Sequence, residues 1–398
     1  MATTSHWQAD AGDTPFPSSN LPPTCDVAVV GGGIAGVSTA YWLRTLDPSL
    51  NVVLVERDRL ASGASGRNAG FLLQGTDADF ARTVAERGAD AARRLWRFTQ
   101  ENRDGLVEAL DGEDVWLDAR GSLTVAADAE EDERLRAAAE LLQHDGVAAT
   151  YRPADATNEH LGSRGFLGSL DVGSGASLHP VRVVRTLAVR SGAAIVEGAA
   201  VRGLEPSGER VRVETERGAV EAGRVVLALN AYLPQLVPAL HNIVRPVRAQ
   251  MLATAPQPRR ISQPVYSHEG YFYLRQLPTG EVLLGGARHL HVEAEVGYED
   301  APTDALQADL EAYLGRHFPD FGGAEVVRRW SGTMGFSADG IPAFGPVPGM
   351  GSAWWVGGFT GHGMGYGFRM GRTVAASVLG ERDVFADLFD AARFGAIG

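Results

Sequence analysis

The sequence predicts an α/β protein in which a nucleotide-binding unit is interleaved with a second, strand-rich unit. A β-α-β pattern with a glycine-rich turn occupies residues 25–56, and α/β patterns return at 177–229 and after 354. The segments between these stretches are helical or strand-rich and lack that alternation. The length of 398 residues suffices for two or three domain-sized units, which is compatible with interleaving.

The β-α-β pattern is the clearest local signal in the chain. It begins with CDVAVV (25–30), a continuous apolar run rich in valine that is typical of a strand buried on both faces of a parallel sheet. Helical spacing follows in IAGVSTAYWLRTL (34–46), and NVVLVE (51–56) returns to strand. These segments together predict one βαβ unit.

Periodicity also predicts the other elements. Apolar residues three and four positions apart predict helices, and short β-branched or alternating runs between turn residues predict strands. The expected elements are helices within 77–145 around a strand at 121–127, a helix and strands at 177–206, a hairpin and a buried strand at 210–229, strands at 245–254, 270–277 and 281–287, a helix at 303–318, a strand at 354–356 and a helix at about 366–379.

These elements define the expected domain organisation. We predict an N-terminal arm at 1–23, a discontinuous nucleotide-binding domain at 24–76, 165–240 and 325–385, a second domain at 77–164 and 241–324, and a C-terminal tail at 386–398. The arm is polar, contains four prolines and has no hydrophobic period, so we expect it to be irregular. Trp7 and Phe16 would hold it to the surface.

Composition excludes several classes of function. The formal net charge of −13 disfavours binding to nucleic acid or to anionic membrane surfaces. All 36 basic residues are arginine, so no lysine can form a Schiff base. The single cysteine, Cys25, excludes an intrachain disulfide and a multi-cysteine metal site, and we predict no metal. The chain has no signal-peptide pattern at MATTSHWQAD and no run of 18 apolar residues, so we expect a cytoplasmic protein.

The turn after the first strand carries a dinucleotide-binding pattern. Gly31, Gly33 and Gly36 stand in the G-x-G-x-x-G frame between a strand and a helix. The first permits the tight turn, the second lets a pyrophosphate approach the backbone, and the third lets helix and strand pack closely. Glu56 ends the second strand about 20 residues later, where a carboxylate can accept hydrogen bonds from a ribose hydroxyl.

The next stretch, RDRLASGASGRNAGF (57–71), is a loop of small residues with no apolar period. It can lie along a pyrophosphate and a flavin ring, with Ser65 and backbone amides as donors and Arg67 near the redox centre. The alternative is an ordinary surface loop. The glycine fingerprint alone does not separate NAD from FAD.

Several motifs give the chain a family resemblance. They are GGGIAGVSTAYWL, LASGASGRNAG, SLHPVRVVRTLA, GAAVRGLEP, RPVRAQMLAT, LRQLPTGEVLLGGARH, WSGTMGFSADGIPAFG and GGFTGHGMGYGF, which together span most of the chain. The chain resembles the FAD-dependent D-amino-acid oxidase superfamily, which includes glycine, sarcosine and γ-glutamylputrescine oxidases. The GASGRN loop and the SHWQAD arm look closest to the γ-glutamylputrescine oxidase-like branch.

The resemblance implies non-covalent FAD, because no cysteine is placed for a flavin link, and a fold with an FAD-binding Rossmann-like domain and an antiparallel-sheet substrate domain. It places Val201 against adenine, and the loop GGFTGHGMGYGF (357–368) at the pyrimidine edge of the flavin. The expected cofactor contacts are Gly31, Gly33, Ile34, Ala35, Gly36, Glu56, Arg57, Ala64, Ser65, Arg67, Asn68, Ala69, Val201, Gly332, Gly361, His362, Gly363 and Met364.

The resemblance also implies a reaction. Members of this family move a hydride from the carbon beside an amine nitrogen to flavin N5, and the imine hydrolyses. Two familiar carboxylate-binding residues are absent, because Met334 and Gly365 occupy their places. Either the substrate has no carboxylate near the reacting carbon, or another arginine binds it.

Arg275 is one candidate, because Tyr271, Tyr273 and Arg275 alternate onto one strand face. The alternative is that this face packs on a helix. Arg288 and His289 follow the next strand and could reach the same cavity. We therefore name Arg67, Tyr271, Tyr273, Arg275 and Met334 as candidate catalytic residues.

Two features of the function stay open. Sarcosine oxidase-like members use a lysine to activate O2, and this chain has none, so the acceptor is either O2 or another electron acceptor such as a partner protein. An alternative to amine oxidation is the oxidation of a 2-hydroxy acid by the same hydride chemistry. A third hypothesis is that the protein is a non-catalytic flavoprotein subunit.

Overall fold

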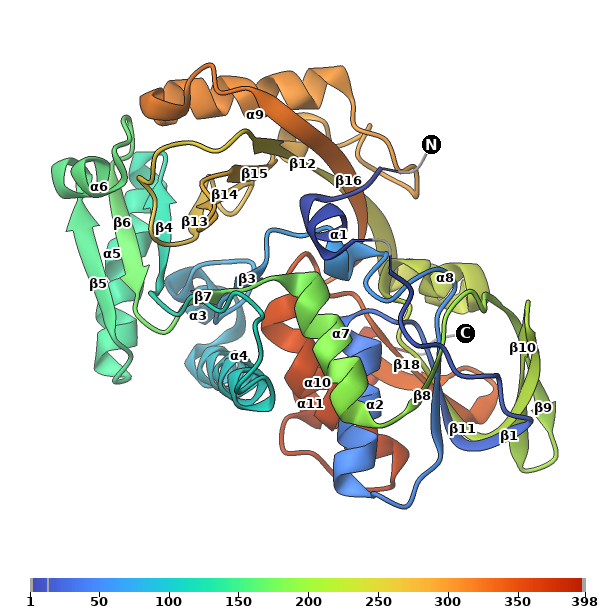
Figure 1. Ribbon diagram of the computed structural model, residues 1–398. Helices are drawn as coiled ribbons and strands as arrows, with labels where there is room; N and C mark the ends of the chain where they lie inside the picture. Colours follow the sequence, from blue (N-terminus) through green and yellow to red (C-terminus); the bar gives the residue numbers. More distant parts are fainter. Residues whose placement is uncertain (1–2, 13, 396–398) are drawn as a thin grey trace.

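Two eight-stranded sheets organise the chain in the computed structural model, which describes residues 3–12 and 14–395 (Figure 1). The first sheet has the order β17-β18-β11-β1-β2-β8, with β10 and β9 continuing from β11. Its strands are β1 (Thr24–Val30), β2 (Val52–Val55), β8 (Ala194–Val196), β9 (Val201–Ser207), β10 (Arg210–Thr215), β11 (Gly218–Leu227), β17 (Ala343–Val347) and β18 (Met350–Gly357).

Strand β1 is central and runs parallel to both β2 and β11. Val27 and Val29 pack into the cluster that contains α2 (Ile34–Leu46), α7 (Pro180–Ser191) and α10 (Gly363–Val378). Ala28 and Val30 pack into a second cluster on the other face. Burial on both faces explains the continuous apolar run and confirms the parallel, Rossmann-like sheet.

The second sheet has the order β16-β12-β15-β14-β13-β4-β6-β5, and every pairing except β13 with β4 is antiparallel. Its strands are β4 (Ser122–Ala126), β5 (Ala149–Pro153), β6 (Gly168–Val172), β12 (Val244–Thr254), β13 (Val265–Ser267), β14 (Phe272–Gln276), β15 (Val282–Gly286) and β16 (Val326–Ser337). Helix α9 (Asp304–His317) lies over β12 and β15 at the top of Figure 1.

The remaining elements connect or cover the two sheets. They are α1 (His6–Ala11), α3 (Phe80–Arg87), α4 (Ala89–Ala109), α5 (Ala129–His144), α6 (Ala154–Leu161), α8 (Leu233–Leu236), α11 (Ala386–Phe389), the two-stranded pair β3 (Phe71–Leu72) and β7 (Ala176–Ser177), and the 3-10 turns η1 (Ala64–Gly66), η2 (Asn230–Tyr232), η3 (Pro238–Asn242), η4 (Arg288–Leu290), η5 (Pro319–Phe321) and η6 (Ala391–Phe394).

Two expected boundaries differ from the sheets that the structure forms. Strands β6 and β16 fall in segments that we assigned to the nucleotide-binding domain, but both pair within the second sheet. The reason for β16 is its long antiparallel ladder with β12, which extends from Val244 opposite Ser337 to Thr254 opposite Val326. Local periodicity identifies a strand, whereas its partner depends on contacts distant in sequence.

The N-terminal arm is not wholly irregular, contrary to our expectation. Ser5 caps helix α1, accepting a hydrogen bond from the Gln8 amide at 3.1 Å, and the Gln8 side chain accepts from the Ser5 amide at 2.9 Å. Trp7 is fully buried. The expected arm and tail also include residues 1–2, 13 and 396–398, which lie outside the described residues. Helix α10 begins at Gly363, about three residues before the expected start.

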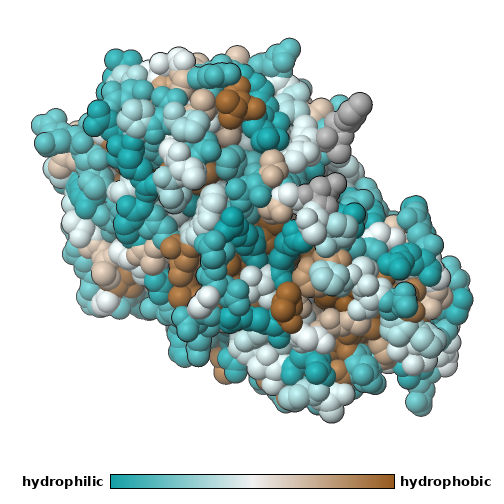
Figure 2. Space-filling model, in the orientation of Figure 1, coloured by the Kyte–Doolittle hydropathy of each residue, from teal (hydrophilic) through white to brown (hydrophobic). Residues whose placement is uncertain are grey.

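The surface agrees with the polar composition. The face shown in Figure 2 is mostly hydrophilic, and its apolar residues occur in small groups. Among the described residues, no helix combines the length and hydropathy that a membrane crossing needs. Cys25 is buried, and desolvation raises the pKa of its thiol to about 12, which makes it a poor nucleophile.

Candidate active site

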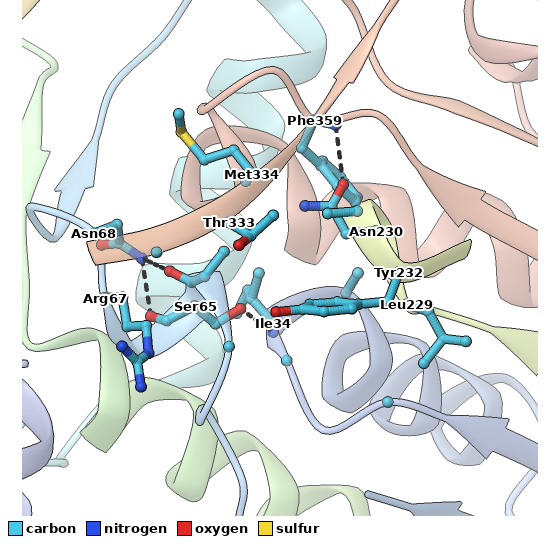
Figure 3. A pocket seen from close by; sticks show the side chains of 18 of the residues that line it. Ile34, Ser65, Arg67, Asn68, Leu229, Asn230, Tyr232, Thr333, Met334 and Phe359 are labelled. Carbon is cyan, nitrogen blue, oxygen red and sulfur yellow. Dashed lines mark hydrogen bonds between the residues drawn. The ribbon is translucent and has the colours of Figure 1, made fainter. Parts of the chain in front are cut away.

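A cavity of about 480 Å³ extends from the glycine-rich turn of the first sheet to the second sheet. This volume lies in the range of small-molecule sites. Figure 3 shows part of its lining, which comes from both sheets and the loops between them. The lining residues fall within 30–35, 55–57, 62–73, 199–202, 228–236, 266–273, 286–288, 332–336 and 359–365, together with residue 249.

The glycine-rich turn is closed by backbone contacts that exclude side chains. Gly31 has φ +112°, and a Cβ there would lie 2.6 Å from the carbonyl oxygen of Ala228. A Cβ on Gly36 would collide with the carbonyl oxygen of Gly31. Gly36 therefore allows the helix to pack on the strand, as expected, but does not itself line the cavity.

Helix α2 begins directly at the cavity wall. Gly33, Ile34 and Ala35 line the cavity, and the Ile34 amide donates to Oγ of Ser65 at 2.9 Å (Figure 3). The N-terminal end of a helix carries partial positive charge, so this wall is suited to phosphate oxygens.

Glu56 holds the same turn from the end of β2. Its carboxylate accepts from the amides of Gly32 at 2.6 Å and Asp58 at 2.8 Å. Desolvation raises the pKa of Glu56, while these two donors act in the opposite direction. The carboxylate thus fixes the loop and lines the cavity where a ribose hydroxyl would donate.

The loop after β2 is held by its own side chains. The Asn68 amide donates to the carbonyl oxygens of Ala64 at 3.1 Å and Ser65 at 2.9 Å (Figure 3), and accepts from the Gly70 amide at 2.7 Å. These bonds order the cavity wall without any bound group.

Helix α1 binds the outer side of this loop, which the sequence did not lead us to expect. Ser5 Oγ donates to the Gly66 carbonyl at 2.5 Å, and Trp7 Nε1 donates to the Asn68 carbonyl at 2.6 Å. Gln8 donates to the carbonyls of Ala61 and Ser62 at 3.3 and 3.1 Å. The S-x-x-Q capping pattern was the available signal for this helix.

Arg67 lines the cavity, but its guanidinium is bound elsewhere. It donates to the Ser62 and Ser331 carbonyls at 2.8 and 2.9 Å and to the Thr3 carbonyl at 2.7 Å. It also forms an ion pair with Asp300 at 3.0 Å. In Figure 3 the head group points away from the other labelled side chains. Its place near the redox centre stays a prediction, and the structure adds that its guanidinium already binds protein groups.

The glycine loop closes the opposite end of the cavity. Residues 361–365 line it as helix α10 begins, and His362 occupies the N-cap position without a side-chain capping bond. A Cβ on Gly365 would lie 2.9 Å from the Leu73 carbonyl oxygen, so a larger residue does not fit. The cavity is thus bounded by two helix N-termini, those of α2 and α10.

Further residues shape the end beside β9. Val201 lines this end, and Arg57 lies 5.0 Å from the ring centre of Tyr232. Asn230 has φ +45°, and its side chain accepts from the Gly358 amide at 3.0 Å. This bond joins the segment after β11 to the segment after β18. Sequence reasoning missed Asn230 and Tyr232. Their one signal is their position directly after the buried strand β11.

Phenol side chains line the end formed by the second sheet. Tyr266, Tyr271 and Tyr273 line the cavity, and burial raises the pKa of Tyr266 and Tyr273, the latter to about 12. Both are therefore neutral phenols at physiological pH. Met334 lies on the same wall, from β16.

Arg275 does not line this cavity, contrary to our expectation. It is 3% exposed, and its Nη1 donates to the Leu178 carbonyl at 2.9 Å and to the Ala69 and Gly70 carbonyls, each at 3.2 Å. Arg275 is two residues beyond Tyr273 on the same strand face, which places it about 7 Å further along the strand. It therefore lies past the cavity, against the loop that contains Ala69 and Gly70.

Comparison with known proteins identifies the family. The model of the FAD dependent oxidoreductase family matches residues 26–377. The chain belongs to this family. It is 28% identical to gamma-glutamylputrescine oxidoreductase of Escherichia coli (strain K12), over 97% of this chain and 92% of that relative. It is 27% identical to glycine oxidase of Pseudomonas aeruginosa, over 82% and 87%.

Solved structures of this FAD dependent oxidoreductase fold superpose closely. L-proline dehydrogenase from P. horikoshii has a TM-score of 0.79 at 22% identity, covering 94% of this chain and 98% of that one. Glycine oxidase from Geobacillus kaustophilus has a TM-score of 0.79 at 20% identity, covering 94% and 98%. These likenesses confirm the expected fold class.

The cavity residues fit the FAD that the family implies. The glycine turn and the α2 N-terminus suit a pyrophosphate, Glu56 suits a ribose, and the α10 N-terminus suits an electron-rich ring edge. Every expected cofactor contact except Gly36 lines the cavity, and so do Tyr271, Tyr273 and Met334. Their individual roles stay predictions. No cluster of three metal-ligating side chains occurs among residues 3–12 and 14–395.

Proposed function

We propose that this FAD dependent oxidoreductase oxidises the C–N bond of an amine or amino acid to an imine, which water then hydrolyses. The observation that carries the proposal is the continuity of the cavity. It extends from the glycine-rich turn and the N-terminus of α2, which suit a dinucleotide, to an aromatic wall that contains three phenols. FAD, when bound, supplies the two-electron acceptor. The named relatives, which include an oxidoreductase of gamma-glutamylputrescine and a glycine oxidase, support amine chemistry.

The protein residues have to orient the amine and keep it neutral. Aromatic side chains around the second-sheet end, among them Phe71, Tyr266 and Phe336, exclude water from the reacting carbon. Within the described lining, Glu56 is the one carboxylate, and it lies at the cradle end. No acid at the second-sheet end therefore favours the ammonium form of the substrate.

His362 is placed to receive the proton that the ammonium must lose. Its Nδ1 lies 2.9 Å from the Thr360 carbonyl oxygen, which can only accept. In the neutral ring Nδ1 therefore carries the proton and Nε2 is left as an acceptor. The neutral phenols of Tyr266 and Tyr273 supply hydrogen bonds to the bound substrate.

The test is a visible absorption spectrum of the purified protein followed by anaerobic titration with primary amines, N-methyl amino acids, D- and L-amino acids, γ-glutamyl polyamines and 2-hydroxy acids. We expect a flavin spectrum that bleaches with one class of amine. Bleaching by hydroxy acids alone would replace C–N with C–O oxidation. A flavin that no donor bleaches would leave a non-catalytic flavoprotein, and a colourless protein without FAD affinity would refute the proposal.

Readmitting air after bleaching then distinguishes the acceptors. Rapid recovery of the oxidised spectrum with formation of H2O2 identifies an oxidase, and slow recovery identifies a dehydrogenase that passes electrons to another acceptor. The absence of lysine from the chain favours the slow outcome.

A further inference from the structure

Arg288 differs from the other arginines that line the cavity, because its guanidinium has no hydrogen-bond or ion-pair partner among the described residues. Arg67 donates to three backbone carbonyls and pairs with Asp300, Arg57 pairs with Asp58 at 2.9 Å, and Arg202 pairs with Glu216. In the part of the chain that the structure describes, no hydrogen bond or ion pair engages the side chain of Arg288. A half-buried cation without a partner at a cavity wall is an available binding group.

The backbone places Arg288 at the wall through a sharp turn at the end of β15. Gly286 has φ +129°, and a Cβ there would collide with the Tyr271 carbonyl oxygen. Ala287 has φ +59°, which is unusual for a residue other than glycine, and its amide donates to the same Tyr271 carbonyl at 2.8 Å. This left-handed alanine is buried, and it brings the next residue over the ring of Tyr271.

Two aromatic rings lie beside the guanidinium. Cζ of Arg288 lies 4.7 Å from the ring centre of Tyr271 and 4.6 Å from that of Phe336. The N–H groups of a guanidinium lie in its plane, so it donates from its edge while its charge is attracted to the aromatic rings. An edge with parallel N–H groups matches the two oxygens of a carboxylate, which accept them side by side.

Among the residues that the structure describes, no acid pairs with this edge. Glu295, in the segment that follows Arg288, is 1% exposed and accepts from Arg248 and from Gln250, both at 2.8 Å. Among the described lining residues, the second-sheet end of the cavity therefore carries one unpaired positive charge and no negative one.

We propose that Arg288 binds a carboxylate of the substrate, so that this enzyme acts on an amino acid or another carboxylated amine and not on a free polyamine. The inference rests on the proposed function. It resolves the alternatives that Met334 and Gly365 leave open, since an arginine at another position replaces the two missing carboxylate-binding residues. A free polyamine would meet a repelling cation and find no acid.

Ligand binding to the oxidised holoenzyme tests the proposal without turnover. Acetate and benzoate are compared with the neutral isosteres acetamide and benzamide, and binding is read from the perturbed flavin absorbance. We expect the carboxylates to bind more tightly than the amides. In Arg288→Gln, carboxylate binding weakens roughly 10- to 150-fold, the effect of losing a charge-assisted hydrogen bond, while amide binding is unchanged.

Two controls separate charge from folding. Arg288→Lys keeps the positive charge but loses the two parallel N–H donors of the guanidinium, so it retains part of the preference for carboxylates. Arg224→Gln removes an exposed arginine on β11, away from the cavity lining, and leaves carboxylate binding unchanged. An FAD spectrum and an unfolding temperature verify each variant. Equal binding of benzoate by wild type and Arg288→Gln, or no preference for carboxylates over amides in wild type, overturns the proposal.

Matched donors distinguish this inference from the proposed function. Sarcosine with dimethylamine, proline with pyrrolidine, and γ-glutamylputrescine with putrescine are compared in anaerobic bleaching. Faster bleaching by the carboxylated member of a pair, lost in Arg288→Gln, supports the inference. Equal bleaching by both members refutes it while amine oxidation stands, whereas no bleaching by any donor refutes amine oxidation itself.

Discussion

The contacts of helix α1 predict that the N-terminal arm controls the retention of FAD. Trp7 is fully buried against the loop that follows β2, and its Nε1 donates to the Asn68 carbonyl. Trp7→Ala removes this bond and the packing of the ring, which costs about 3–5 kcal/mol of unfolding free energy for a buried tryptophan. We expect the arm to detach and residues of the loop to lose their order before the sheets unfold.

The effect on affinity follows from the entropy of ordering the loop. If two loop residues become disordered without FAD, binding must order them again at about 1–2 kcal/mol each, which corresponds to a rise of roughly 30- to several-hundred-fold in Kd. Trp7→Phe keeps most of the ring and loses the Nε1 donor, so its effect is about 1 kcal/mol, or several-fold in Kd.

Titration of apoprotein with FAD, followed by flavin fluorescence, measures these constants, and circular dichroism measures unfolding. Trp354→Ala is the matched control, because this half-buried tryptophan of β18 lies outside the cavity lining. It should lower the unfolding temperature without changing the FAD Kd. A native Kd in Trp7→Ala, with a lowered unfolding temperature, would show that the arm adds stability alone and would refute the reasoning.

Three further predictions test the cradle and its surroundings. Glu56→Gln keeps one side-chain oxygen but loses the negative charge to which the amides of Gly32 and Asp58 donate, so the FAD Kd should rise roughly 10- to 150-fold in the same titration. An unchanged Kd would contradict a role of Glu56 in binding FAD. Gly36→Ala drives a methyl group into a carbonyl of the turn and should abolish FAD binding, whereas Gly315→Ala, in helix α9 with nothing within 4 Å, should raise the unfolding free energy by about 0.5–1 kcal/mol in urea denaturation. Burial lowers the pKa of His268 to about 4 from an unfolded value near 6.5. The unfolding free energy should therefore be insensitive to this group above pH 6.5 and should fall by up to about 1.4 kcal/mol per pH unit as the pH drops toward 4. His268→Gln should flatten this slope, and an equal slope in both proteins would refute the prediction.

Local patterns predicted much of the fold because local chemistry determines it. The apolar run of β1 and the glycines after it satisfy steric requirements that are visible in sequence, and the backbone atoms that a Cβ at Gly31 or Gly36 would meet explain why those positions are glycine. The elements were therefore predictable. The sheet to which a strand belongs was not, as β16 shows, because its ladder with β12 joins segments about eighty residues apart.

The positions of side chains were harder to predict, because they too depend on contacts between segments that are distant in sequence. Alternation correctly placed Tyr271 and Tyr273 in the cavity, but it could not tell where the cavity ends along the strand, so Arg275 was misplaced. The sequence also could not show that Arg288 lacks a partner, because the nearby Glu295 pairs with Arg248, which is distant in sequence. Which arginine is free is a property of the whole ion-pair network.

The bonds of Arg67 have a consequence for how a substrate enters. This one guanidinium ties the N-terminal arm to β16 of the second sheet and to Asp300, and the Arg67 carbonyl accepts from Trp330 Nε1 at 2.8 Å. A hinge motion that parted the two sheets would have to break these bonds together. We therefore expect ligand exchange in this molecule to leave the two sheets joined.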